Sequence, residues 1–288
     1  MGFEIRGRVL KRYTEEEGIT EVTIPESVTN IGEGAFSNCT DLTSITIPKS
    51  VKSIGCDAFY KCTSLTSITI PESVKSIGNG AFWGCTGLTE IKVNNNNNNI
   101  YCDIDGVIFS KDKKTLLVYP VGKAGFYSVP KGVTSIGDDA FRNCTALTGI
   151  IIPESVTNIG NFAFGDCISL TSITIPGSVT SIDKRAFWGC TGLTGITIPD
   201  SITSIGEGAF ERCTSLTGIT IPDSVAIIGY GAFMNCTGLT SITIPDSVTI
   251  IGKLAFYNCS KLKTVSLPSH FMEKMNGVFP ENAEITYR

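Results

Sequence analysis

Apolar and polar positions recur along the chain with a fixed period of 23 residues. A proline preceded by Ile, Val or Leu marks each period, at Pro25, Pro48 and Pro71 and again at Pro130, Pro153, Pro176, Pro199, Pro222, Pro245 and Pro268. An Ala-Phe pair recurs in the same register, with its phenylalanine at Phe36, Phe59, Phe82, Phe141, Phe164, Phe187, Phe210, Phe233 and Phe256. A cysteine follows three positions after each, at Cys39, Cys62, Cys85, Cys144, Cys167, Cys190, Cys213, Cys236 and Cys259. A period of this length indicates a repeat protein, in which stacked coils bury one continuous core.

Each period predicts one coil that contains a short strand. In the second period, Ser44-Ile45-Thr46-Ile47 alternates polar and β-branched apolar residues, which is typical of a strand. Pro48 lacks an amide hydrogen and ends this strand. The serine two positions after each proline suits a turn in which the hydroxyl bonds nearby backbone. We expect Val51 and Ile54 to point inward, and Ala58-Phe59 to return the chain over the core through one helical or 3₁₀ turn.

A glycine follows the inward isoleucine, Ile54 in the second period, in every coil except one, which has Asp183 there. The glycines of this column are Gly32, Gly55, Gly78, Gly137, Gly160, Gly206, Gly229 and Gly252. Aspartate tolerates the left-handed backbone region that glycine otherwise supplies, whereas a β-branched residue does not. The column therefore predicts a turn with positive φ.

The complete repeat, Leu-x-x-Ile-x-Ile-Pro-x-x-Val-x-x-Ile-Gly-x-x-Ala-Phe-x-x-Cys, resembles the BspA-like leucine-rich repeat, also called the Treponema pallidum type. The resemblance covers nearly the entire chain. It implies a mainly β repeat solenoid, right-handed and curved, with the Ile-x-Ile strands forming a parallel sheet on the concave side. For function, it implies that many relatives are surface adhesins or interaction proteins of host-associated bacteria.

We expect a single solenoid over residues 1–288, divided into caps, repeats and one insert. An N-terminal cap covers residues 1–23, repeats cover 24–93 and 130–268, and a C-terminal cap covers 269–288. The insert at 94–129 begins with the run Asn94 to Asn99, which fits a flexible loop or a linker. A loop is favoured because the apolar columns resume in register on both sides.

The insert and the two ends predict further strands. Tyr101 to Phe109 and Thr115 to Tyr119, joined by the turn from Ser110 to Lys114, indicate a β-hairpin. Ile104-Asp105-Gly106-Val107-Ile108 is similar to Ile5-Arg6-Gly7-Arg8-Val9-Leu10, so the insert resembles a second copy of the opening cap. The repeat is lost from Phe271 onward, and Ala283 to Tyr287 predicts a last strand that closes the core.

Composition and charge argue against several classes of function. The pI near 5.2, with 23 basic and 27 acidic residues, gives no clustered positive charge for nucleic acid or anionic lipid. His270 is the one histidine, which removes most imidazole catalysis and most histidine metal sites. No phosphate loop, paired carboxylates or nucleophile elbow emerges from the repeats. We therefore expect no enzymatic activity and no cofactor.

Two repeated columns could suggest metal chemistry. The nine cysteines stand one per coil without Cys-x-x-Cys clusters, so we expect buried thiols that act as small apolar groups. Cys56 occupies a polar column and should be exposed, and Cys102 lies in the insert. A calcium site at Asp200, Asp223 and Asp246 is conceivable, but one carboxylate per coil supplies too few oxygens, so a solvated turn is favoured. We expect no metal site.

Two surfaces are candidates for binding. Large side chains follow the repeat phenylalanine at Tyr60, Trp83, Trp188, Met234 and Tyr257, where other coils have small or polar residues, and this variation indicates exposure. Such side chains serve as interface anchors or shield the edge of the core, and both remain open. The alternative is the concave face, with Thr46, Thr69, Thr174, Thr197, Thr220 and Thr243. Its threonine columns are similar to ice-binding solenoids, but the curved sheet, the glycines in the partner column and the β-propensity of Thr argue against that role.

The sequence thus predicts a non-enzymatic binding scaffold, adhesin-like, for a protein or glycan partner and not for nucleic acid. The alternative is a purely structural spacer module of a larger surface protein. We expect a monomer or weak self-association, and no transmembrane segment because no run of 18 apolar residues occurs. The resemblance favours the cell surface or secretion. The missing signal peptide and the many thiols favour the cytoplasm, so both compartments remain open.

Overall fold

The computed structural model describes residues 2–94, 101–272 and 277–288. The run Asn94 to Asn99, apart from Asn94 itself, lies outside the described residues. The chain forms a mainly β solenoid with almost no helix, which confirms the predicted fold class. It divides into two compact units, Met1–Ala124 and Gly125–Arg288, and each is described by itself. The expected single solenoid and the boundaries of its caps and repeats stay predictions.

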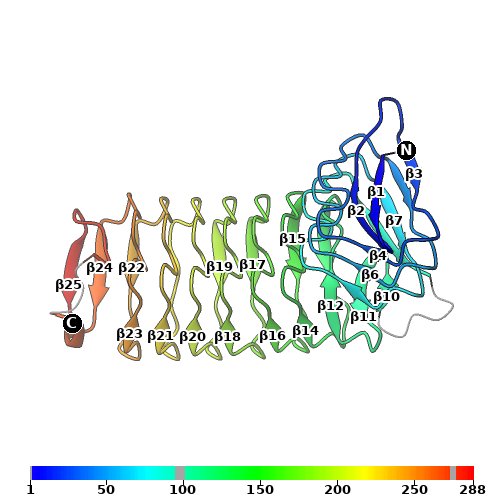
Figure 1. Cartoon of the computed structure of the whole chain (residues 1–288). Helices are drawn as coiled ribbons and strands as arrows, with labels where there is room; N and C mark the ends of the chain where they lie inside the picture. The colour runs from blue at the N-terminus through cyan, green and yellow to red at the C-terminus, as the bar shows by residue number, and fades with distance from the viewer. Residues whose placement is uncertain (1, 95–100, 273–276) are drawn as a thin grey trace. The chain divides into compact units, whose positions relative to one another are not determined.

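Most coils contribute a strand to each of two parallel ladders. The first ladder contains the Ile-x-Ile strands, and the second contains two-residue strands that end at the inward isoleucine before the glycine column. Figure 1 shows the two ladders of the second unit as two rows along the stack. The second ladder was not predicted from the sequence, because a strand of two residues has no alternation to recognise.

In the first unit, β1 (Phe3–Arg6) and β2 (Val9–Tyr13) form an antiparallel hairpin that precedes the coils. The first ladder contains β3 (Glu21–Thr23), β5 (Ser44–Thr46), β7 (Ser67–Ile70) and β9 (Glu90–Val93). The second ladder contains β4 (Asn30–Ile31), β6 (Ser53–Ile54) and β8 (Ser76–Ile77). The insert contains β10 (Tyr101–Ile104), β11 (Val107–Ser110) and β12 (Thr115–Val118), which pair antiparallel in that order. The predicted turn from Ser110 to Lys114 joins β11 and β12, which confirms the insert hairpin, and β1 with β2 confirms the one at the amino terminus. The expected first arm, Tyr101 to Phe109, is itself two antiparallel strands, because Asp105 and Gly106 have positive φ and turn the chain.

In the second unit, the first ladder contains β13 (Gly125–Ser128), β15 (Leu147–Ile151), β17 (Ser172–Thr174), β19 (Gly195–Thr197), β22 (Ser241–Thr243), β24 (Thr264–Leu267) and β25 (Glu284–Tyr287). The second ladder contains β14 (Ser135–Ile136), β16 (Asn158–Ile159), β18 (Ser181–Ile182), β20 (Ser204–Ile205), β21 (Ile227–Ile228) and β23 (Ile250–Ile251). One short 3₁₀ helix, η1 (Ser269–Phe271), follows β24. The predicted last strand is β25, which pairs parallel with β24.

The repeat phenylalanines form a stacked column inside each unit. The rings of Phe36 and Phe59 lie 5.3 Å apart, and those of Phe164 and Phe187 lie 5.4 Å apart with planes 2° from parallel. The column continues to Phe279, whose ring lies 4.9 Å from that of Phe256. The repeat register therefore extends past Phe271, which corrects the expectation that it ends there. Buried aromatic rings at this spacing stabilise each coil on its neighbours.

The Ala-Phe segments form consecutive turns, where one helical or 3₁₀ turn was expected. In the first coil Gly34 has φ 59° and Asn38 has φ 62°, and these left-handed residues interrupt any right-handed helix. Hydrogen bonds within the coil, such as Cys39 N to Phe36 O, alternate with bonds to the next coil, such as Phe36 N to Ala58 O. Every second amide is thus used to join coils.

The glycine column does not have positive φ, so that prediction is wrong for Gly32, Gly55, Gly78, Gly137, Asp183, Gly160, Gly206, Gly229 and Gly252. Positive φ falls two positions later, for example at Gly34, Asp57 and Phe162. The column needs glycine because the coils approach each other closely there. A Cβ on Gly229 would lie 2.7 Å from the backbone nitrogen of Glu207 in the preceding coil.

Asp183 marks a break in the second ladder of the second unit. The glycine amides on either side bond the preceding coil, as Gly160 N to Ile136 O and Gly206 N to Ile182 O do at 2.9 and 2.7 Å. Among the described residues, Asp183 N makes no such bond, and β16 and β18 belong to different sheets. The break is local, because Phe164 N still bonds Ala186 O at 2.8 Å between the same two coils.

Candidate functional site

The nine column cysteines are buried and each thiol faces the core, as predicted. Eight of their Sγ atoms lie against a backbone carbonyl of the preceding coil. The acceptor is that coil's repeat phenylalanine, or Tyr13 for Cys39; Cys190 Sγ, for example, donates to Phe164 O at 3.0 Å. Burial raises the pKa of Cys190 to about 12, which keeps it protonated. These thiols join coils and are not nucleophiles. Cys56 is exposed, as predicted, and Cys102 has no described side chain.

The large side chains after the repeat phenylalanines are less exposed than predicted. Tyr257 is 54% exposed, whereas Tyr60, Trp83, Trp188 and Met234 are half-buried. In the first unit the Trp83 ring lies over Gly80, where a Cβ would meet its Cδ2 at 2.7 Å, and the ammonium of Lys61 lies 5.2 Å from the Tyr60 ring. These side chains mainly cover the coil edges, and their role in binding stays a prediction.

Trp188 belongs to a network of aromatic rings and guanidinium groups that the sequence did not suggest. The Trp188 ring meets Phe162 edge-on at 6.3 Å, and the Arg212 guanidinium lies 5.6 Å from Trp188. Arg142 and Arg185 lie 4.3 and 5.5 Å from the Phe162 ring. Cation–π contacts of this kind stabilise neighbouring coils. The network therefore holds Trp188 in place instead of presenting it as a free anchor.

Carboxylates neutralise most of this network. Arg142 pairs with Asp139 at 3.0 Å, and Arg185 lies 3.8 Å from Glu211 and 4.0 Å from Glu207. Burial raises the pKa of Asp166, and the positive charges of Arg142 and Arg212 partly oppose this effect. Ion pairs, and cation–π contacts between neighbouring coils, thus hold this network together, which is a structural role.

The threonines of the first ladder, Thr46, Thr69, Thr174, Thr197, Thr220 and Thr243, are all exposed. Neighbouring coils align them, as in the pairs Thr23 with Thr46 and Thr174 with Thr197. The ladder is not one continuous sheet, because it pairs in separate groups, β3 with β5, β7 with β9, β13 with β15, β17 with β19, and β22 with β24 and β25. Between these groups, adjacent coils are not joined by strand pairing.

An exposed apolar patch lies on the first ladder at the start of the second unit. Phe126 is 63% exposed and Ile151 is 54% exposed. Phe126 pairs with Gly149 across β13 and β15, and a Cβ on Gly149 would lie only 2.9 Å from Phe126 Cδ2. The ring thus lies across the glycine of the next strand. This face therefore carries a bulky apolar side chain beside its threonine columns. The visible signal was Phe126 itself, which stands in the outward column that holds Ser44 in the second coil and Gly149 in the next one, while Tyr127 and Val129 replace the Ile-x-Ile pair.

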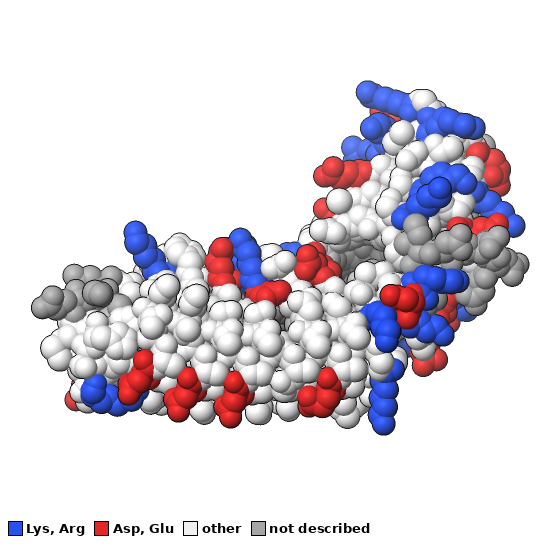
Figure 2. Space-filling model, turned by 90° about the horizontal axis from the view of Figure 1, so that it is seen from below, with Lys and Arg blue, Asp and Glu red and all other residues white. Residues whose placement is uncertain are grey.

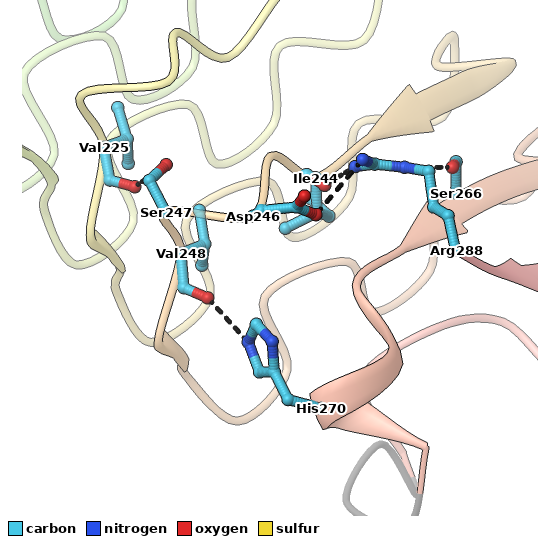
Figure 3. Close-up of polar contacts among 8 residues, drawn as sticks. All are labelled: Val225, Ile244, Asp246, Ser247, Val248, Ser266, His270 and Arg288. Atoms are coloured by element: carbon cyan, nitrogen blue, oxygen red, sulfur yellow. Dashed lines mark hydrogen bonds and ion pairs between the residues drawn. The ribbon is translucent and has the colours of Figure 1, made fainter.

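A groove of about 600 Å³ opens further along the same face. Gly195, Gly218, Thr220 and Thr243 line it, with Asp223 and Arg288 also at its wall. The Arg288 side chain is held in place, since Nε donates to Ser266 Oγ at 2.8 Å, Nη1 lies 3.2 Å from Asp246 Oδ1, and Nη2 donates to the carbonyl of Ile244 (Figure 3). The groove therefore has one fixed and neutralised cation at its wall.

The acidic column borders this face. Asp200, Asp223 and Asp246 are exposed, and Figure 2 shows acidic side chains spaced along one edge of the second unit. Within the described residues, no three His, Cys, Asp or Glu side chains come together closely enough to hold a metal ion. In the same part of the chain, no helix has the length and hydropathy of a membrane span. The column instead supplies an acidic border.

The geometry defines a class of protein, a repeat scaffold of stacked β coils. The chain belongs to the BspA type leucine rich repeat family, whose model matches residues 11–110, 124–239 and 190–287. No curated protein sequence gives a significant match.

Solved structures of bacterial leucine-rich repeat proteins share the fold. A leucine rich cell surface protein from Faecalibacterium prausnitzii is 34% identical, with a TM-score of 0.62 over 86% of this chain and 60% of its own. The pneumococcal vaccine antigen PcpA is 26% identical, with a TM-score of 0.64 over 93% of this chain and 62% of its own. A leucine-rich repeat protein from Eubacterium ventriosum is 24% identical, with a TM-score of 0.57 over 87% and 88% of the two chains. The chain spans about 60% of the length of the first two proteins.

Proposed function

We propose that the protein is a non-enzymatic, adhesin-like scaffold that binds a protein partner through the first-ladder face of its second unit. The observation that carries this proposal is the 63% exposed ring of Phe126 beside the 54% exposed Ile151. Exposed aromatic side chains supply most of the binding energy in many protein interfaces.

The Phe126 ring is already positioned for binding. Because it lies across Gly149, it loses little side-chain freedom when a partner covers it. Ser172 and Thr174 of β17 and Thr197 of β19 continue the face beyond the patch and are exposed. An apolar centre with a polar surround is the usual arrangement of a protein interface.

The relatives support a place at the cell surface. One similar structure is described as a cell surface protein and another as a vaccine antigen. A binding scaffold displayed outside the cell would meet extracellular proteins.

A second candidate surface is the row of turns that carries Tyr257, which is 54% exposed. Its neighbour Met234 is half-buried, and Trp188 is held in the aromatic network. In the first unit, Tyr60 and Trp83 remain candidates of the same kind. The alternative role for the chain is that of a structural spacer, with binding residues elsewhere in a larger protein.

The test uses the whole chain, labelled with a fluorophore at its α-amino group. The labelled protein is applied to an array of purified extracellular-matrix proteins and to a glycan array. The proposal expects a matrix protein to bind, and Phe126→Ser to weaken that binding by tenfold or more. Ile168→Ser is the matched control, since Ile168 is 45% exposed but lies outside both ladders. Loss with Tyr257→Ser alone would move the site to the turns. Binding to glycans alone would overturn the protein partner, and no binding to either array would favour the spacer.

A further inference from the structure

The groove on the first ladder of the second unit contains a strand segment that its neighbours leave unpaired. Among the described residues of this unit, the first-ladder segment Gly218–Thr220 pairs with neither the preceding nor the following coil. β19 pairs only with β17, and β22 pairs only with β24. Gly218, Ile219 and Thr220 make no backbone hydrogen bond within the described part of the chain. Their N–H and C=O groups face the neighbouring coils without a direct backbone bond, so they are open to a polar ligand group that enters between the coils.

The opening also exposes apolar surface at the base of the groove. Ile196 and Ile219 are half-buried, whereas the equivalent isoleucines of other coils, Ile45, Ile68, Ile91, Ile150, Ile173 and Ile242, are buried. Both residues line the groove. A ligand that enters it therefore covers apolar surface as well as backbone polar groups.

Two glycines keep the groove open. A Cβ added to Gly195 or Gly218 would meet no atom within 4 Å, and neither residue has positive φ. In other coils of this unit the same outward position carries Ser172, Ser241 or Thr264, and at Gly149 the ring of Phe126 covers the glycine. The missing side chains leave a strip of backbone onto which another extended chain can settle.

The charge at one end of the groove is negative. Asp223 lines the groove and makes no ion pair within the described residues, and Asp200 lies exposed in the same column of the preceding coil. The nearby cation, Arg288, is already paired with Asp246. A ligand group near Asp223 is therefore favoured if it is positive.

From these features we infer that the groove binds an extended polypeptide segment with a lysine or arginine at its Asp223 end. The lining follows the coil from Gly218 to Asp223, so the ligand runs along the strand direction and its backbone bonds Gly218–Thr220. The inference rests on the proposed function in placing partner contacts on the first-ladder face. It adds the chemistry of one bound segment, apart from the Phe126 patch.

The test measures fluorescence anisotropy of fluorescein-labelled (Thr-Lys)₄, (Thr-Glu)₄ and (Pro-Lys)₄ peptides with the full chain. (Thr-Lys)₄ should bind, and (Thr-Glu)₄ should bind at least tenfold more weakly. (Pro-Lys)₄ has the same charge with half its amide hydrogens removed, so it should also bind at least fivefold more weakly. Equal binding of the two lysine peptides would show charge adsorption and would overturn the inference.

Variants locate the site. Gly218→Trp fills the groove and should weaken (Thr-Lys)₄ binding tenfold or more, whereas Ser172→Trp, in the same outward position of a paired coil, should leave it unchanged. Asp223→Asn should weaken it about fivefold, whereas Glu154→Gln, in the same column three coils away, should not. Unchanged binding by Gly218→Trp, or binding of none of the peptides, would overturn the inference. Phe126→Ser should not change peptide binding, so a failure here is separate from a failure of the proposed function.

Discussion

His270 Nε2 lies 2.9 Å from the carbonyl oxygen of Val248, in the place that a serine hydroxyl occupies in the preceding coil (Figure 3). Ser247 Oγ donates to Val225 O at 2.9 Å, and the same bond recurs from Ser73, Ser155, Ser178, Ser201 and Ser224. The serine column was predicted to bond nearby backbone. Its acceptor belongs to the preceding coil, so each hydroxyl joins two coils. His270 continues this column at the end of the array.

This relationship predicts that His270→Ser keeps the bond and His270→Ala loses it. A carbonyl only accepts, so Nε2 must carry the hydrogen, and a serine hydroxyl can replace it. We expect His270→Ala to lower the free energy of unfolding by about 0.5 to 1 kcal/mol and His270→Ser to change it by less than half as much. Urea unfolding measures both. Equal losses would show that ring contacts with Phe271, 4.4 Å away, matter more than the bond.

Close packing of coils predicts opposite results for two glycines that both lack positive φ. Gly229→Ala should destabilise the protein by about 1 to 3 kcal/mol, because its Cβ would lie 2.7 Å from backbone atoms of the preceding coil. Gly195→Ala should be neutral or stabilise by up to about 1 kcal/mol, because its Cβ enters open space and the unfolded chain loses freedom. Thermal unfolding by circular dichroism compares the two. A similar loss in both variants would contradict the close-approach explanation.

The glycine column shows what the sequence could and could not predict. Periodicity identified the fold, the column of inward phenylalanines and the buried cysteines, because each of these depends on a side chain that repeats. It could not tell whether Gly229 supplies a positive φ or a close approach, since both need glycine. The positions with positive φ are occupied by residues as different as Gly34 and Phe162, so no shared residue type marks them in the sequence.

The candidate site was harder to predict, because it depends on how coils pair. Gly195–Thr197 and Gly218–Thr220 have the same sequence, Gly-Ile-Thr, yet the first pairs with β17 and the second is unpaired. Local preference is equal, so the opening is a property of the stack. Phe126 was visible in the sequence, but it stands where the repeat is altered and was not assigned to the face.

Thiol reactivity distinguishes the exposed cysteine from the column. In a Cys102→Ser background, native protein should react with a thiol reagent at Cys56 alone among ten cysteines, and all ten should react after unfolding. Burial raises the pKa of Cys39, Cys190 and Cys259 to about 12, so little thiolate forms at neutral pH. Mass spectrometry of labelled peptides gives the sites. Fast native labelling of Cys190 would mean that the column opens to solvent.

The raised pKa of Asp166 predicts a pH-dependent effect of Asp166→Asn. Burial raises the pKa of Asp166 in the folded protein. The ionised carboxylate therefore lowers the free energy of unfolding at pH values above the folded-state pKa. This loss disappears as the pH falls below the pKa of the unfolded state, about 3.9. Asparagine carries no charge and suits the backbone, because Asn38, Asn143, Asn235 and Asn258 occupy the same column with positive φ. We therefore expect the variant to melt higher than wild type at pH 7, with the difference shrinking toward pH 3.

The control for this prediction is Asp200→Asn, at an exposed carboxylate that makes no ion pair within the described residues. Its melting temperature should match wild type at both pH values. If Asp166→Asn gave the same gain at pH 3 as at pH 7, the gain would come from the backbone preference of asparagine. If the variant melted lower at pH 7, the attraction of Arg142 and Arg212 for the carboxylate would outweigh its burial, since both guanidinium groups favour the charged form.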